Sequence, residues 1–89
     1  MESGISGRGL GFSYLSWIKK QADRLGLKGV AFFKHDGSIK VIAEGEEENL
    51  IKLGKKLEKG RIFSLVESFY FEWKEPDVGF QDFSINYQN

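Results

Sequence analysis

The chain has 89 residues, of which 40% are hydrophobic and 29% are charged, a composition typical of one folded domain. Thirteen basic residues balance thirteen acidic residues, which argues against binding nucleic acid or membranes through an overall positive field. The absence of cysteine excludes disulfides, thiolate metal sites and a cysteine nucleophile, and in so small a domain it favours a reducing, cytoplasmic compartment. The single histidine, His35, cannot form a histidine metal cluster within one chain.

The first 26 residues predict a loop followed by a helix. Residues 2–11 are dense in glycine, which indicates a loop or a flexible end; these glycines are Gly4, Gly7, Gly9 and Gly11. Apolar residues then recur at helical spacing, at Leu15, Ile18, Ala22 and Leu25. Gly26 is a suitable C-terminal cap for this helix.

A hairpin is predicted next. Residues 29–34 are apolar and aromatic, and residues 38–43 contain several β-branched side chains. Between them, Asp36-Gly37 is a strong turn signal. Phe32 and Phe33 are neighbours on the first of these strands, so their side chains point to opposite faces. One can join the core under the helices. The other is expected on the open face or at the family's active-site position, where it either packs against neighbours such as Tyr70 or Phe12 or forms an apolar patch that binds a partner.

The second half of the chain predicts a helix and two strands. The helix begins near Glu46 and ends at Gly60, and its acidic first turn and basic last turns suit the helix dipole. Its apolar stripe consists of Leu50, Leu53 and Leu57. Residues 65–73 alternate in the manner of a half-buried strand that stops before Pro76, and residues 83–87 form a last short strand.

Adding one strand before the first helix gives the order βαββαβ, an α+β ferredoxin-like sandwich with two helices on one face of an antiparallel sheet. The whole chain, residues 1–89, is expected to form this single domain. The first strand is expected to be shortened, because only residues 1–6 remain for it and only Met1 and Ile5 are strongly apolar. Three alternatives stay open: these residues form a short strand, the true start lies elsewhere, or another chain completes the sheet.

The glycine-rich segment has a family resemblance. Gly9-Leu10-Gly11-Phe12, leading into a helix, resembles the phosphate-binding loop of acylphosphatases, which usually has the sequence G-R-V-Q-G-V-G-F-R. The similarity continues in one register over about residues 9–87, including Asp36-Gly37-Ser38 at the hairpin turn and Phe83, Ile85 and Tyr87 in the last strand. Ile5-Ser6-Gly7-Arg8 is similar to the strand end V-S-G-R, which makes the loop two residues shorter; without a gap, Arg8 takes the place of the family's glutamine.

The resemblance implies a four-stranded antiparallel sheet and the hydrolysis of carboxyl-phosphate anhydrides without metal or cofactor. It also implies that the backbone amides of Gly9, Leu10, Gly11 and Phe12 surround a phosphate group. In the family an arginine after the loop clamps the phosphate, and an asparagine on the second strand holds the attacking water.

Both of these catalytic side chains are replaced here. Ser13 follows Phe12 in place of the arginine, and serine offers one neutral hydrogen bond without charge. Phe33 falls at the asparagine position and cannot orient water. Arg8 is a candidate substitute for the lost guanidinium, although a solvated arginine beside a loop is the simpler interpretation. The sequence therefore predicts an acylphosphatase-like protein whose hydrolase activity is lost or strongly reduced and which retains weak anion binding.

Two alternatives remain. One is an active acylphosphatase in which Arg8 and Ser13 act as substitutes, and the other is an interaction module that uses the face or edge of its sheet, including self-association. The expected partners are thus phosphate, an acyl phosphate or a protein, without nucleic acid or membrane. His35 could act as a general base, but no partner for it is visible and it is expected to face water.

Overall fold

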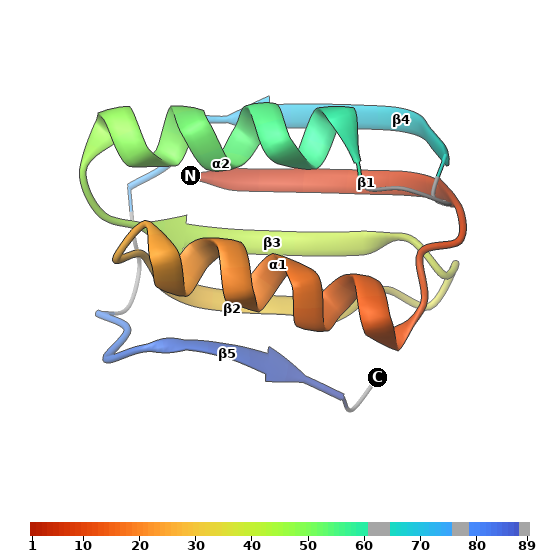
Figure 1. The fold of residues 1–89 in the computed structure, drawn as a ribbon, viewed down its shortest axis with the longest axis horizontal. Helices are drawn as coiled ribbons and strands as arrows, with labels where there is room; N and C mark the ends of the chain where they lie inside the picture. The colour runs from red at the N-terminus through yellow and green to blue at the C-terminus, as the bar shows by residue number, and fades with distance from the viewer. Residues whose placement is uncertain (61–64, 76–78, 88–89) are drawn as a thin grey trace.

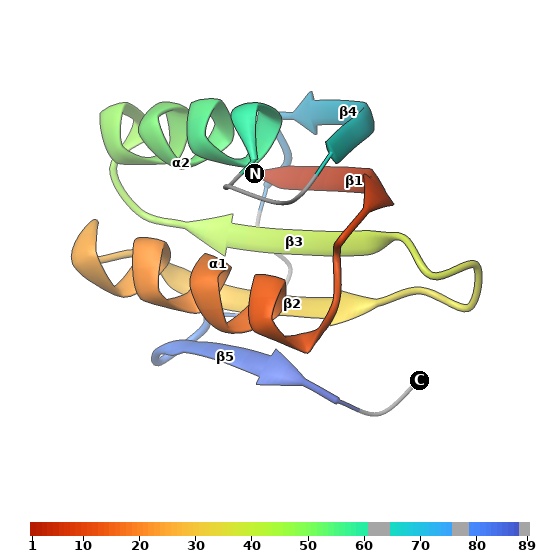
Figure 2. The ribbon, with the colours of Figure 1, turned by 45° about the vertical axis from the view of Figure 1, so that its right-hand side comes forward.

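The computed structural model describes residues 1–60, 65–75 and 79–87. Its elements are β1 (Glu2–Arg8), α1 (Phe12–Arg24), β2 (Lys28–Phe33), β3 (Ile39–Glu44), α2 (Glu47–Lys59), β4 (Leu65–Glu72) and β5 (Phe83–Asn86). The strands form one sheet in the order β4-β1-β3-β2-β5. Both helices lie on one face of this sheet (Figure 1, Figure 2). The predicted ferredoxin-like βαββαβ sandwich is confirmed.

The segment predicted as a loop over residues 2–11 is a strand through Arg8, so that prediction was wrong for most of its length. β1 pairs antiparallel with β4 along its seven residues and with β3 over residues 2–5. The strand therefore forms within this chain, and it is short only on the β3 side. Glycine is required at Gly4 because a Cβ there would collide with the ring of Tyr70. Glycine has a low strand propensity, but at this position it allows close packing against Tyr70 and does not indicate a loop.

The sheet is mixed, which corrects the expectation of an antiparallel sheet. β5 pairs parallel with β2, from Gly29 opposite Phe83 to Phe32 opposite Asn86, whereas the other neighbouring strands are antiparallel. Figure 1 shows the reason: β5 begins at the end of the sheet where β4 finishes and β2 begins. The two strands predicted at the C-terminal side end one residue earlier than expected, and Pro76 lies outside the described residues.

The hydrophobic core fills the space between the two helices and the sheet. The helix stripes predicted from spacing are buried as expected, and the fully buried large side chains include Leu15, Ile18, Leu53 and Leu57. Tyr14 is fully buried, and its hydroxyl donates a 3.3 Å hydrogen bond to the carbonyl of Leu57. This bond ties α1 to α2 and fixes the start of α1 above the sheet.

Candidate functional site

The loop between β1 and α1 ends on the N-terminus of α1. Gly9 has a φ of 74°, a conformation that favours glycine, and Gly11 is the N-cap residue. The Gly11 carbonyl accepts hydrogen bonds from the amides of Tyr14 at 3.0 Å and Leu15 at 3.3 Å. The first turn of α1 carries no acidic side chain. The partial positive charge of this helix end is therefore not neutralised by an acidic side chain of its own first turn.

The predicted phosphate-loop residues lie together at this end of the molecule. Gly9, Gly11 and Phe12 are exposed, whereas Leu10 is half-buried and packs against the core. Ser13 is exposed in the first turn of α1. The geometry thus provides a helix N-terminus and a neutral hydroxyl, where the family resemblance implies a guanidinium.

Three aromatic rings occupy the space above the end of β2. Phe33 is half-buried, packs against the core, and meets the ring of Phe12 edge-on at a centroid distance of 5.5 Å. Tyr87, just after β5, lies 5.6 Å from the same Phe12 ring. Of the two neighbouring phenylalanines, Phe33 is thus the one that packs against Phe12, one of the two neighbours that the sequence analysis allowed. The contribution of Tyr87 was missed, because only the parallel placement of β5 beside β2 brings it there.

Arg8 points away from this aromatic cluster. Its Nε atom lies 4.0 Å from Oε2 of Glu67 on β4, and its side chain is 81% exposed. β3 separates β1 from β2, so β4 and Phe33 lie on opposite sides of Arg8 in the sheet order. The structure therefore does not bring Arg8 together with Phe33, and an exposed pair at this distance holds the guanidinium only weakly.

A shallow hollow lies beside the β2–β3 hairpin. Its volume is about 500 Å³, and it is lined by Phe32, Phe33, Lys34, His35, Asp36, Lys40 and Asn86. Lys34 and His35 are exposed, as the sequence predicted. Asn86 lies opposite Phe32 in the β2–β5 pairing, which places an amide beside the hollow. This placement could not be predicted, because the alternation of side chains in the last strand does not identify the strand with which it pairs.

A cluster of polar side chains on the face of the sheet opposite the helices joins β1, β3 and β4. The carboxylate of Glu2 accepts a 2.9 Å hydrogen bond from the Tyr70 hydroxyl and a 3.3 Å bond from Lys74 Nζ, and Lys40 Nζ lies 3.5 Å away. Burial alone would raise the pKa of Glu2, but these hydrogen bonds and lysine charges outweigh it and hold that pKa below its ordinary value. Burial and the neighbouring carboxylate of Glu2 raise the pKa of Tyr70 to about 12.

Within residues 1–60, 65–75 and 79–87, no three acidic or histidine side chains converge to hold a metal ion. Over the same residues, neither helix has the length and apolar character needed to cross a membrane.

Comparison with known proteins agrees with the fold. A family model described as acylphosphatase matches residues 2–85. The chain belongs to the acylphosphatase family. It is 36% identical over 85 residues to an acylphosphatase of Bacillus licheniformis, covering 93% of this chain and 92% of that protein. It is 38% identical over 86 residues to an acylphosphatase of Helicobacter hepaticus, covering 91% and 90% respectively.

A solved structure gives the same result in three dimensions. The crystal structure of an acylphosphatase from Bacillus subtilis superimposes with a TM-score of 0.85 at 28% identity, covering 97% of this chain and 96% of that one. The scaffold of the family is thus present over nearly the whole chain.

Proposed function

We propose that this protein keeps the acylphosphatase scaffold but has lost most or all of the hydrolysis of acyl phosphates. The observation that carries the proposal is the packing of Phe33 against Phe12 at 5.5 Å. By the family resemblance, Phe33 stands where an asparagine holds the attacking water. An apolar ring in edge contact with a second ring offers no hydrogen-bonding group at that position to hold the water.

The missing charge adds to this effect. Ser13 stands where the resemblance implies an arginine, and Arg8 extends toward Glu67 instead. Removing a single preorganised hydrogen-bond donor slows an enzyme by about 10²–10³-fold. Loss of an arginine that stabilises a transferred phosphoryl group costs about 10³–10⁵-fold. Either replacement is therefore sufficient to make the reaction slow.

Weak phosphate binding is the part of the family function that the loop still supports. The backbone amides at the start of α1 do not depend on the identity of the lost side chains, and no acidic side chain stands in the first turn. Titration of inorganic phosphate into the ¹⁵N-labelled protein should shift the amide signals of residues 9–13. If phosphate up to tens of millimolar leaves these signals in place, the loop has lost anion binding as well.

The proposal is tested by restoring the two side chains. The wild type and the double variant Ser13→Arg, Phe33→Asn are assayed for hydrolysis of benzoyl phosphate above the rate in buffer. The expected result is little or no turnover by the wild type and a clear gain by the double variant. The single variants Ser13→Arg and Phe33→Asn serve as matched controls, and each should gain less than the pair.

The alternative of an active enzyme is tested in the same assay. If the wild type turns over benzoyl phosphate and Arg8→Ala abolishes that turnover, Arg8 moves away from Glu67 to act in the site, and the proposal is wrong. If the wild type is active and Arg8→Ala does not change the rate, the proposal is also wrong, and hydrolysis does not depend on Arg8.

A further inference from the structure

The outer flank of α2 and the edge strand β4 enclose an apolar groove, which we call the α2–β4 groove. Its volume is about 290 Å³, and it is lined by Glu47, Ile51, Gly54, Lys55, Glu58, Phe69, Phe71 and Trp73. Trp73 is 53% exposed and Ile51 is 39% exposed. An exposed tryptophan beside an exposed isoleucine is unusual on a surface that only contacts water.

The missing side chain at Gly54 lets the Phe71 ring pack directly against α2 at the floor of the groove. Gly54 lies against the ring of Phe71, and a Cβ at Gly54 would come within 2.7 Å of that ring. Trp73 packs edge-on against Phe71 at a centroid distance of 5.0 Å and forms one wall. These rings hold the groove in a fixed shape, so a partner would not have to order it first.

Among the described residues, no second strand pairs with the sheet edge beside the groove. β4 is the outermost strand of the sheet and has eight residues, without proline. In the described part of the chain, β1 is its only strand neighbour. A strand of this length at an edge offers backbone donors and acceptors to another chain.

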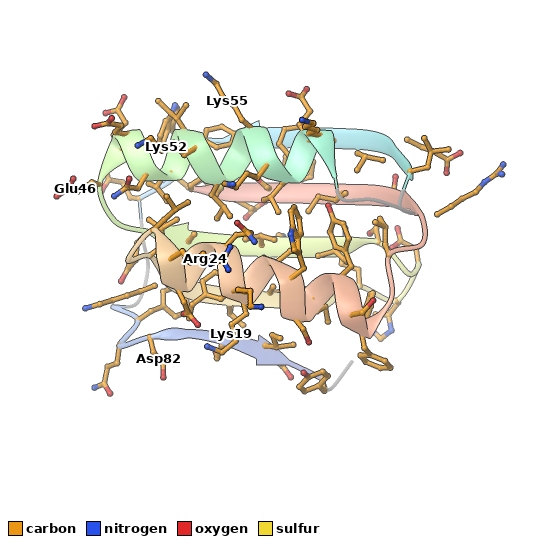
Figure 3. All side chains as sticks on the ribbon, viewed as in Figure 1. Lys19, Arg24, Glu46, Lys52, Lys55 and Asp82 are labelled. Carbon is orange, nitrogen blue, oxygen red and sulfur yellow. The ribbon has the colours of Figure 1, made fainter. Side chains whose placement is uncertain are left out.

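The charges along the groove identify the partner. Glu47, Ile51 and Lys55 follow one another at intervals of four residues and line the same groove, so they form one stripe on α2. Figure 3 shows Lys55 extending outward beyond the β4 edge. Among the described residues, no ion-pair partner is found for Glu47 or Lys55, whereas the neighbouring Lys52 is paired with Glu48 at 3.6 Å.

This stripe is complementary to itself when reversed. If a second α2 lies antiparallel and the two Ile51 side chains meet, Glu47 of each copy stands opposite Lys55 of the other. A twofold axis perpendicular to the sheet gives this arrangement and also brings the two β4 edges together antiparallel, with all four helices on one face. The net charge of zero adds no long-range repulsion between copies.

We propose that the α2–β4 groove is the interface of a symmetric dimer, with a second copy of this chain as its occupant. Ile51 lies at the twofold axis, and two Glu47–Lys55 pairs flank it. The rings of Phe71 and Trp73 supply the apolar contact beside the helices. This assignment does not depend on whether acyl phosphates are hydrolysed.

The experiment is a charge swap followed by sedimentation velocity from about 10 μM to about 1 mM. The wild type should show a concentration-dependent dimer. Lys55→Glu and Glu47→Lys should each weaken dimerisation by about tenfold or more, because each places like charges together at both symmetric pairs. The double variant Glu47→Lys, Lys55→Glu should recover the dimer. An equimolar mixture of the two single variants should also dimerise, because their stripes are complementary to one another.

Two controls make the outcome decisive. Lys20→Glu makes the same charge change as Lys55→Glu, but at an exposed position on α1, so it should leave the dimer unchanged. Circular dichroism checks that every variant is folded. A wild type that stays monomeric at 1 mM overturns the proposal. The proposal is also wrong if Lys55→Glu and Glu47→Lys leave the dimer as strong as in the wild type. It is wrong as well if neither the double variant nor the mixture of the two single variants restores the dimer.

Discussion

The contact between Phe12 and Phe33 gives a prediction whose size can be worked out from the structure. Phe33 is half-buried and Phe12 is 62% exposed, with their rings edge-on at 5.5 Å. Replacing a fully buried phenylalanine with alanine lowers the free energy of unfolding by about 3 kcal/mol or more. Because Phe33 is only half-buried, we expect Phe33→Ala to lower it by about 1–2 kcal/mol. The ring contact itself should contribute about 0.5–1 kcal/mol, at the low end for aromatic pairs because Phe12 is exposed.

A double-mutant cycle separates these two contributions. Phe12→Ala, Phe33→Ala and the double variant are unfolded in urea, and the coupling energy is the difference between the double loss and the sum of the single losses. The matched control pairs Phe12→Ala with Phe32→Ala, since Phe32 points to the opposite face of the same strand. Coupling near zero in both cycles would show that the rings do not pack in solution, and the reason given for lost water binding at Phe33 would fail.

Two further predictions concern the side chains on the open face of the sheet. Because the folded pKa of Glu2 is lowered, its carboxylate stabilises the fold above the ordinary carboxyl pKa, and this contribution is lost as pH falls through the lowered value. Glu2→Gln should therefore lower stability by about 1 kcal/mol at pH 7, and chemical denaturation should show a much smaller difference from the wild type at pH 3. Gly4→Ala should cost about 1–3 kcal/mol because its Cβ meets the Tyr70 ring, and the same change should cost less in a Tyr70→Ala background. An equal loss in both backgrounds would refute the steric explanation.

The helices and the hairpin could be predicted from sequence because their signals are local. The stripe of Leu50, Leu53 and Leu57 requires only a period of 3.6 residues, and all three side chains are buried as predicted. The Asp36-Gly37 turn is likewise set by neighbouring residues, and the Lys34 amide bonds the Ser38 carbonyl across it at 2.7 Å.

β1 was predicted only from the βαββαβ order, as a shortened strand over residues 1–6, because its residues have strand structure only in the context of the sheet. Gly4 lowers the local strand propensity, yet the position accepts only glycine once Tyr70 lies over it. The two residues are far apart in the sequence, so no local pattern reveals the contact. The Glu2 cluster was missed for the same reason, since Tyr70 and Lys74 reach Glu2 from β4 and its end.

The candidate site was predicted in part. The loop and the contact of Phe33 with Phe12 follow from the resemblance and from the alternation of side chains along β2. The addition of Tyr87 and the direction of Arg8 depend on which strands become neighbours. The family resemblance therefore marks Ser13 and Phe33 as the positions proposed to be replaced, but the sheet order decides which side chains surround them.

The most direct test of the central claim is the steady-state kcat/KM of the wild type for benzoyl phosphate, measured beside the Bacillus licheniformis acylphosphatase in the same buffer. With a neutral hydroxyl at Ser13 and an apolar ring at Phe33, the account predicts a value lower by at least about 10³-fold. A value within about tenfold of that enzyme would contradict the account, because it would mean that hydrolysis proceeds without the two side chains to which the loss is attributed.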